Sequence, residues 1–276
     1  MWVTKVSGKK EKFQKEKIRK TCLRAGANSK FAKEVAEKVS SYIYDGIPTR
    51  EILRLTLRIL EKERPVVALR YDLKKAILDL GPSGFGFEEF IARILSEYGY
   101  KTKMPPPLEG ACISHEVDIV AEKDGRRYMI ECKYRNEPGV YIGIKDVLYT
   151  WARFLDLCEG FKLKRCLRLD HPWFICNTKF SRDAIQFACC KRVKLTGWRY
   201  PQGRGVSLEK LIERKGIYPI TVLKEIDKGV RQKLIKANII LCRDLLKKNI
   251  KELKKITGMD TQKLKVCKSL ITQIIE

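Results

Sequence analysis

The sequence predicts an α/β protein in which a central sheet lies between a mainly helical N-terminal region and an all-α C-terminal region. Three observations carry this prediction. Apolar residues recur at three- and four-residue spacings through residues 15–80, helical and strand patterns alternate through 81–202, and residues 203–276 are helical and rich in lysine. We therefore divide the chain into regions 1–80, 81–202 and 203–276.

The composition favours a polyanionic partner. The 276 residues include 58 lysines and arginines against 33 acidic residues, which gives a formal net charge of +25. Each phosphate that such a protein neutralises releases counterions, although a solubilising or heat-adapted surface is the alternative. No apolar run approaches the ~18 residues of a membrane helix, and the first residues lack the apolar block of a signal peptide. We expect a cytoplasmic protein with no membrane partner.

The first region begins with a small hairpin at residues 2–14, followed by helical patterns. Thr49 is a suitable N-cap for a helix that Pro65 closes. The segments VTK at the start, EKI at Glu16–Ile18 and IYDGIPTREI at Ile43–Ile52 resemble the ATP-cone, a regulatory nucleotide-binding domain. The resemblance covers roughly residues 1–80.

The ATP-cone resemblance implies that ATP or dATP binds to this region. By position, Lys5 and Lys17 would meet phosphates, while Thr49 and Val3 would lie near the nucleotide. Val6 stands where the family usually has arginine, and a cone that has lost its ligand or serves for docking is the alternative. The chain has no GxxxxGK[ST] phosphate loop, so the nucleotide is expected as an effector rather than as fuel.

A β-hairpin is predicted at His115–Arg135, HEVDIVAEKDGRRYMIECKYR. Asp124-Gly125 suits the positive φ angles of a two-residue turn between two apolar runs. Counting back from this turn puts Asp118 opposite Glu131, with Cβ atoms roughly 4.5–5.5 Å apart. Period-two alternation places Lys133 on the same face as Glu131 and turns the Cys132 side chain to the other face.

The glycine- and proline-rich segment at residues 81–86 predicts a boundary, and the helix FEEFIARILSEYGY follows it. At ~100° per residue, Glu88 borders the apolar stripe of this helix while Glu89 points away from it. We therefore expect Glu88 to reach a site beside the core and Glu89 to be solvated. An acid on a helix, followed by Asp118 and Glu131-x-Lys133 on adjacent strands, resembles the PD-(D/E)xK nucleases.

The wider pattern narrows this resemblance. The segments HEVDIVAE, IECKYR, CNTKFSRDAIQFA and LTGWRYP are most similar to the restriction-endonuclease branch that includes Mrr-type enzymes. This implies a central mixed sheet and a Mg²⁺- or Mn²⁺-dependent endonuclease. Asp118 and Glu131, with Glu88 and the backbone carbonyl of Cys132, would supply metal ligands, and Lys133 would assist the water. An ordinary exposed hairpin of mixed charge is the alternative.

The last region carries a weak repeat of about 30 residues that is similar to tandem helix–hairpin–helix modules. Gly229 and Gly258 lie near the two turns, and in these modules the backbone N–H groups of the turn contact DNA phosphates. Asp260 takes the place of the usual second glycine. A helical bundle for protein interaction is the alternative.

Together these expectations describe a DNA endonuclease of a restriction system that ATP or dATP modulates. DNA and a nucleoside triphosphate are the expected partners, and a homodimer is a candidate assembly. Two other functions remain open from the sequence: a structure-specific repair or junction nuclease, and a nucleotide-responsive DNA-binding protein without hydrolysis.

Overall fold

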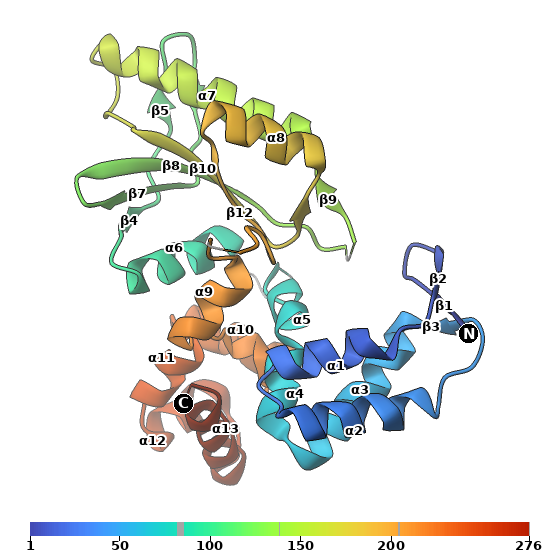
Figure 1. Ribbon diagram of the computed structural model, residues 1–276. Coiled ribbons are helices and arrows are strands. Elements are labelled where there is room, and N and C mark those ends of the chain that lie inside the picture. The colour runs from blue at the N-terminus through green and yellow to red at the C-terminus, as the bar shows by residue number, and fades with distance from the viewer. Residues whose placement is uncertain (82–85, 138, 204, 276) are drawn as a thin grey trace. The chain divides into compact units, whose positions relative to one another are not determined.

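The computed structural model describes residues 1–81, 86–137, 139–203 and 205–275, and it divides into two compact units (Figure 1). One unit joins Met1–Ile77 with Tyr218–Glu276, and the other is Leu78–Ile217. Most of the boundary expected at 81–86 lies outside the described residues. Within the described ranges, no helix is long and apolar enough to cross a membrane.

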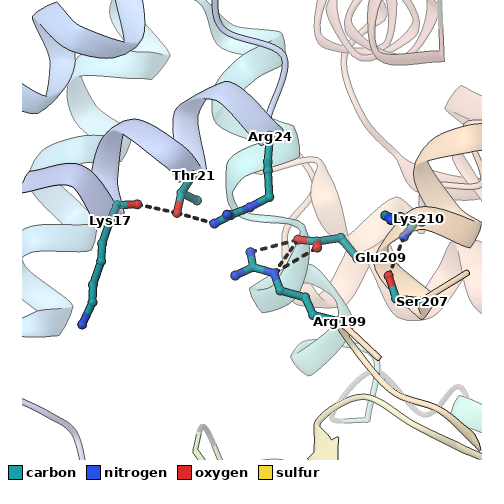
Figure 2. Close-up of polar contacts among 7 residues, drawn as sticks. All are labelled: Lys17, Thr21, Arg24, Arg199, Ser207, Glu209 and Lys210. Atoms are coloured by element: carbon teal, nitrogen blue, oxygen red, sulfur yellow. Dashed lines mark hydrogen bonds and ion pairs between the residues drawn. The ribbon is translucent and has the colours of Figure 1, made fainter. Parts of the chain in front are cut away.

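The N-terminal segment is a small sheet beside five helices. Strand β1 pairs antiparallel with β2, as expected for the hairpin, and parallel with β3. Asn28 caps α2, and an apolar core that includes Phe31 and Leu60 joins the helices. Figure 2 shows α1, where the Thr21 hydroxyl donates to the carbonyl of Lys17. The elements are β1 (Trp2–Thr4), β2 (Lys10–Lys12), α1 (Lys15–Arg24), α2 (Ser29–Ser40), β3 (Ile47–Pro48), α3 (Thr49–Glu63), α4 (Pro65–Tyr71) and α5 (Leu73–Leu78).

The expected N-cap at Thr49 is wrong by one position. Pro48 occupies the N-cap position of α3, with extended backbone and no side-chain capping bond, and Thr49 is the first helical residue. Proline suits this place because the chain enters the helix from β3, where Pro48 is the last residue. Thr49 therefore lies in the first turn of α3 and not at its N-cap position.

The C-terminal segment is all-α and closes around Leu234, Leu253 and Leu264, which are fully buried. Helix α10 contacts α12, and α13 contacts both α11 and α12. Gly258 ends α12 with φ +73°, a left-handed conformation that suits glycine. The elements are η2 (Ile220–Val222), α10 (Lys228–Lys236), α11 (Cys242–Lys247), α12 (Ile250–Thr257) and α13 (Thr261–Ile275).

Specific bonds hold the two segments of this unit together. Helix α4 packs against α13, and Arg70 donates from Nη2 to the carbonyl of Ile274 at 2.8 Å. The buried Thr221 hydroxyl donates to the carbonyl of Ala76 at 2.7 Å. Lys224 also pairs with Glu61 and Asp72 of the N-terminal segment. The two ends of the chain therefore form one packed body.

The unit Leu78–Ile217 is built on a five-stranded mixed sheet of order β12-β10-β8-β7-β4. Strands β4, β7 and β8 are antiparallel, whereas β8, β10 and β12 run parallel. Helices α7 and α8 pack together on the sheet, and α6 contacts β4, β7 and β8 (Figure 1). This confirms the mixed sheet flanked by helices. The elements are α6 (Phe87–Glu97), β4 (Lys101–Lys103), β7 (Ile119–Lys123), β8 (Arg126–Lys133), α7 (Ile144–Lys162), β10 (His171–Cys176), α8 (Arg182–Lys191) and β12 (Lys194–Thr196).

Among its described residues the same unit also has two short strand pairs and the helix α9 (Leu208–Lys215). Tyr98, which follows α6, donates its hydroxyl to the carbonyl of Leu211 in α9 at 2.9 Å. Figure 2 shows Ser207 capping α9 and a two-armed ion pair between Arg199 and Glu209. Helix α9 lies within the region 203–276 of the sequence division, but in the structure it belongs to the unit Leu78–Ile217. The short pairs are β5 (Leu108–Glu109) with β6 (Ser114–His115), and β9 (Tyr141–Ile142) with β11 (Lys179–Phe180).

Candidate active site

The hairpin of β7 and β8 has the register that the sequence predicted. Asp124 and Gly125 both have positive φ angles, +53° and +72°, as a two-residue turn matched to the strand twist requires. Lys123 faces Arg126, and the pairing continues to Ile119 opposite Ile130. Asp118 directly precedes β7 and Glu131 follows Ile130 on β8, so the register set by the turn brings the two acids to the same end of the hairpin.

A backbone bond fixes Asp118 against the neighbouring strand. The Cys132 N–H donates to Oδ2 of Asp118 at 2.7 Å. The Cys132 side chain is buried, as alternation predicted, while its neighbours Glu131 and Lys133 are half-buried. Burial raises the pKa of the Cys132 thiol well above its ordinary value, so this thiol stays protonated.

Both carboxylates are costly to ionise in the folded protein. Burial and then the charge of Asp118 raise the pKa of Glu131 to about 7, although Arg153 and Lys133 oppose the shift. Burial also raises the pKa of Asp118, and the Glu88 charge adds to this effect while the Cys132 N–H opposes it. Two neighbouring acids with raised pKa values form a pair that an additional cation would stabilise.

Glu88 and Glu89 differ as the helical phase predicted. Both lie in the first turn of α6, where Glu88 is half-buried and Glu89 is exposed. Glu88 is close enough to Asp118 to raise the pKa of that acid. It therefore contributes negative potential to the site.

The donor set suits a hard divalent cation. Two carboxylates with a backbone carbonyl beside them are the oxygen ligands that Mg²⁺ and Mn²⁺ prefer. Among the residues that the structure describes, no group of three or more histidine, cysteine or acidic side chains is close enough to hold a metal. A cation here would take its remaining ligands from water, backbone carbonyl oxygen or substrate phosphate, as Mg²⁺ commonly does.

Arg153 is a site residue that the sequence reasoning missed. It lies on α7, and its Nη1 donates to Oε2 of Glu131. Its position was detectable because Val147, Thr150, Phe154 and Leu157 form the buried stripe of this helix. Position 153 is three residues after Thr150 and four before Leu157, so a charged side chain there borders the core.

Asn177, which follows β10, was also missed. Its side-chain oxygen accepts from the Arg135 N–H at 2.9 Å, and its amide donates to the Arg135 carbonyl at 2.8 Å. These two bonds hold the chain just after Lys133. Asparagine thereby extends the strand pairing of β8 with β10 beyond its last ladder residue.

His115 has a structural place in this hairpin region. Its Nε2 lies 2.8 Å from Oδ2 of Asp156, a residue of α7 that also accepts from the backbone N–H groups of Cys112 and Ile113. Burial opposes ionisation of Asp156, but these hydrogen bonds, led by that of Cys112, outweigh it and lower its pKa to about 2. The pair ties the β5–β6 segment to α7.

The structure brings two of the expected nucleotide-binding residues together. Lys5 lies 2.8 Å and Lys17 3.1 Å from the two carboxylate oxygens of Glu11, and the bond from Lys5 lowers the pKa of that acid. Val3 is buried between two pairing strands, so only its backbone could face a ligand. Thr49 begins α3 at the end of the same small sheet.

The C-terminal turns differ from the expected phosphate-binding arrangement. Asp227 accepts from the Val230 N–H at the start of α10, and Asp260 accepts from the Gln262 N–H at the start of α13. Gly229 lies within the first turn of α10. Carboxylates thus occupy the N–H groups that the helix–hairpin–helix resemblance would assign to phosphate, because aspartate is a strong N-cap.

Comparisons with known proteins agree with this architecture. Family models match for an ATP cone domain at residues 1–73, a restriction endonuclease at 81–197 and an AF1548-like C-terminal domain at 218–275. An uncharacterized protein of Archaeoglobus fulgidus is 45% identical over 174 residues, which are 63% of this chain and 92% of that protein. A crystal structure titled as a protein of unknown function, AF1548, is 41% identical and has a TM-score of 0.55, covering 68% of this chain and 96% of that one.

The fold and the acid pair define a restriction-endonuclease-like nuclease domain, here in a chain with an ATP cone. The sequence identity and the coverage of these relatives identify the family of the chain. The chain belongs to the AF1548-like family.

Proposed function

We propose that this protein is a Mg²⁺-dependent DNA endonuclease of the restriction type, modulated by ATP or dATP. One observation carries the proposal. The hairpin register brings Asp118, which directly precedes β7, near Glu131 on β8; burial raises the pKa of both acids, and the charge of Asp118 adds to the shift of Glu131. Such perturbed pairs are typical of sites that bind a catalytic cation. The Mrr-type restriction endonuclease match at 81–197 agrees with this chemistry.

In this proposal Asp118 and Glu131 hold the cation, with the Cys132 carbonyl as a further oxygen ligand and Glu88 adding negative potential. A bound Mg²⁺ would lower the pKa of a coordinated water and offset charge on the phosphate. The Lys133 amino group, which shares a face with Glu131, positions or deprotonates the attacking water. Asn177 keeps Lys133 aligned by fixing the backbone that follows it.

The net charge of +25 supports DNA as the substrate, because it supplies affinity for phosphates that does not depend on sequence. In the C-terminal segment the turn N–H groups are capped by Asp227 and Asp260, so lysine side chains would make the phosphate contacts there. DNA binding should accordingly weaken steeply with salt. A homodimer remains a candidate assembly.

The nucleotide site is proposed at the small sheet of the ATP cone. Lys5 and Lys17, which share Glu11, would turn to the phosphates, with Thr49 and the backbone of Val3 nearby. The absence of a phosphate-loop motif from the sequence supports an effector role.

The test is cleavage. Supercoiled, linear, single-stranded, branched and methylated DNA would be incubated with Mg²⁺ or Mn²⁺, with and without ATP or dATP. We expect metal-dependent cutting by the wild type and a loss of about 100-fold or more in Asp118→Asn and Lys133→Met. Asp124→Asn, an acid-to-amide change at the turn of the same hairpin, should cut normally.

Two outcomes of this cleavage assay would favour a different function. Cutting confined to branched DNA would favour a repair or junction nuclease over a restriction enzyme. DNA binding without metal-dependent cutting of any substrate would reject the nuclease and leave a nucleotide-responsive DNA-binding protein.

A further inference from the structure

Arg153 places a positive charge next to the acid pair of Asp118 and Glu131. Its guanidinium bonds Oε2 of Glu131, and its side chain is only 11% exposed. Its Nε is buried with no hydrogen-bond partner among the described residues. The same guanidinium stacks on Tyr149, one helical turn earlier, with Cζ 4.8 Å from the ring centroid. One oxygen of Glu131 and one aromatic ring therefore hold this arginine.

The charges around Glu131 show why this contact matters. Asp118 repels it, Asp146 of α7 adds to the repulsion, and Arg153 and Lys133 oppose both. Asp146 is itself paired with Arg135 at 3.5 Å. Arginine keeps its charge at every accessible pH, so the guanidinium compensates the acid pair permanently. It also occupies an oxygen that a metal ion would use.

We propose that Arg153 is a positioning residue that competes with the divalent cation for Glu131. This inference rests on the proposed metal-dependent function. Without a cation, the guanidinium keeps Glu131 oriented toward Asp118 and stabilises the hairpin. With a cation, it must yield part of its contact, and the exposed Tyr149 ring offers a surface on which it remains stacked. Arg153 thereby lowers the affinity of the site for metal.

The test measures metal binding directly, without DNA and without catalysis. Mn²⁺ would be titrated by calorimetry and by electron paramagnetic resonance into the full-length protein at about pH 8.5, above the pKa of about 7 for Glu131. We expect Arg153→Gln to bind Mn²⁺ about tenfold more tightly than the wild type, because a charge-assisted bond no longer competes. Arg153→Lys should fall between them, since it keeps the charge but loses the planar fork.

The matched control is Arg127→Gln, because Arg127 on β8 also pairs with a carboxylate, Glu122, at 2.8 Å. It should leave Mn²⁺ affinity unchanged. The metal-free Arg153→Gln protein should melt at a lower temperature than the wild type, whereas saturating Mn²⁺ should narrow that difference. Arg153→Lys provides the comparison if the glutamine variant does not fold.

Asp118→Asn separates failure of this inference from failure of the proposed function. If Asp118→Asn loses Mn²⁺ binding while both Arg153 variants bind no more tightly than the wild type, competition is overturned and the metal site stands. If the wild type and Asp118→Asn bind Mn²⁺ equally weakly, the metal site itself is rejected, and the role of Arg153 with it.

Discussion

At the scale of single residues, the site depends on a carboxylate that the fold makes costly to ionise. The folded-state pKa of Glu131 is about 7 against an ordinary value of 4.5, so the folded protein favours the protonated form. Stability is then lost as the pH rises from about 4.5 to about 7 and stays low above that range. A bound cation would remove this penalty, which links metal binding to stability.

Glu131→Gln should therefore stabilise the metal-free protein at high pH. The variant and the wild type should melt alike near pH 4.5, and the variant should be more stable by about 2–3 kcal/mol at pH 8. Thermal melts across this pH range measure the difference. The exposed Glu89→Gln serves as the control. A difference that is constant with pH, or that favours the wild type at pH 8, would contradict the pKa shift.

At the scale of the element, the two-residue turn between β7 and β8 determines how the acids of the site are aligned. The turn at Asp124-Gly125 sets the register, and a slip of one residue would send Glu131 to the opposite face of the strand. Gly125 has φ +72°, where a β-branched side chain clashes with its own backbone. The alignment of the acids thus depends on a residue at the far end of the strands.

Gly125→Val should destabilise the protein by about 1–2 kcal/mol, the cost of a left-handed residue with a Cβ atom. It should also weaken Mn²⁺ binding, because the strands twist to relieve the strain and the acids separate. Chemical denaturation and Mn²⁺ titration measure the two effects. Asp124→Asn is the control, since asparagine tolerates positive φ. Unchanged stability and affinity in Gly125→Val would show that the turn does not set the register.

At the scale of the whole molecule, the chain forms two compact units, and one of them joins its two ends. Thr221 and Lys224 bind the last helices of the ATP cone, and Arg70 binds the end of α13. A nucleotide that stabilises the cone would therefore act on the C-terminal segment through direct contacts. The nuclease unit carries its acids, its lysine and Arg153 within Leu78–Ile217.

Calorimetry of the full-length protein should show two transitions with different ligand responses. Mn²⁺ should raise only the transition of the nuclease unit, and ATP or dATP should raise only the other by about 5 °C. Lys5→Ala should reduce the nucleotide shift, whereas Lys9→Ala in the same hairpin should not. Thr221→Val should lower the transition that nucleotide raises. Identical melting curves with and without nucleotide would reject a ligand-binding cone.

Local rules explain which parts of the fold were predictable. The turn at Asp124-Gly125, the alternation along β8 and the contrast between Glu88 and Glu89 depend on residues a few positions apart. Thr49 was misplaced by one position because proline can also occupy the N-cap position. Helix boundaries depend on backbone angles that short patterns constrain only loosely.

The sequence by itself determined that Asp118, Glu131 and Lys133 share one end of a hairpin, because steric limits on φ and the period of a strand act within that segment. Only the tertiary structure decided that Arg153 on α7 meets Glu131, and that residues 218–275 pack against the cone. Those contacts join segments far apart in the chain. They follow from which buried faces fit together, and that fit is a property of the packed molecule.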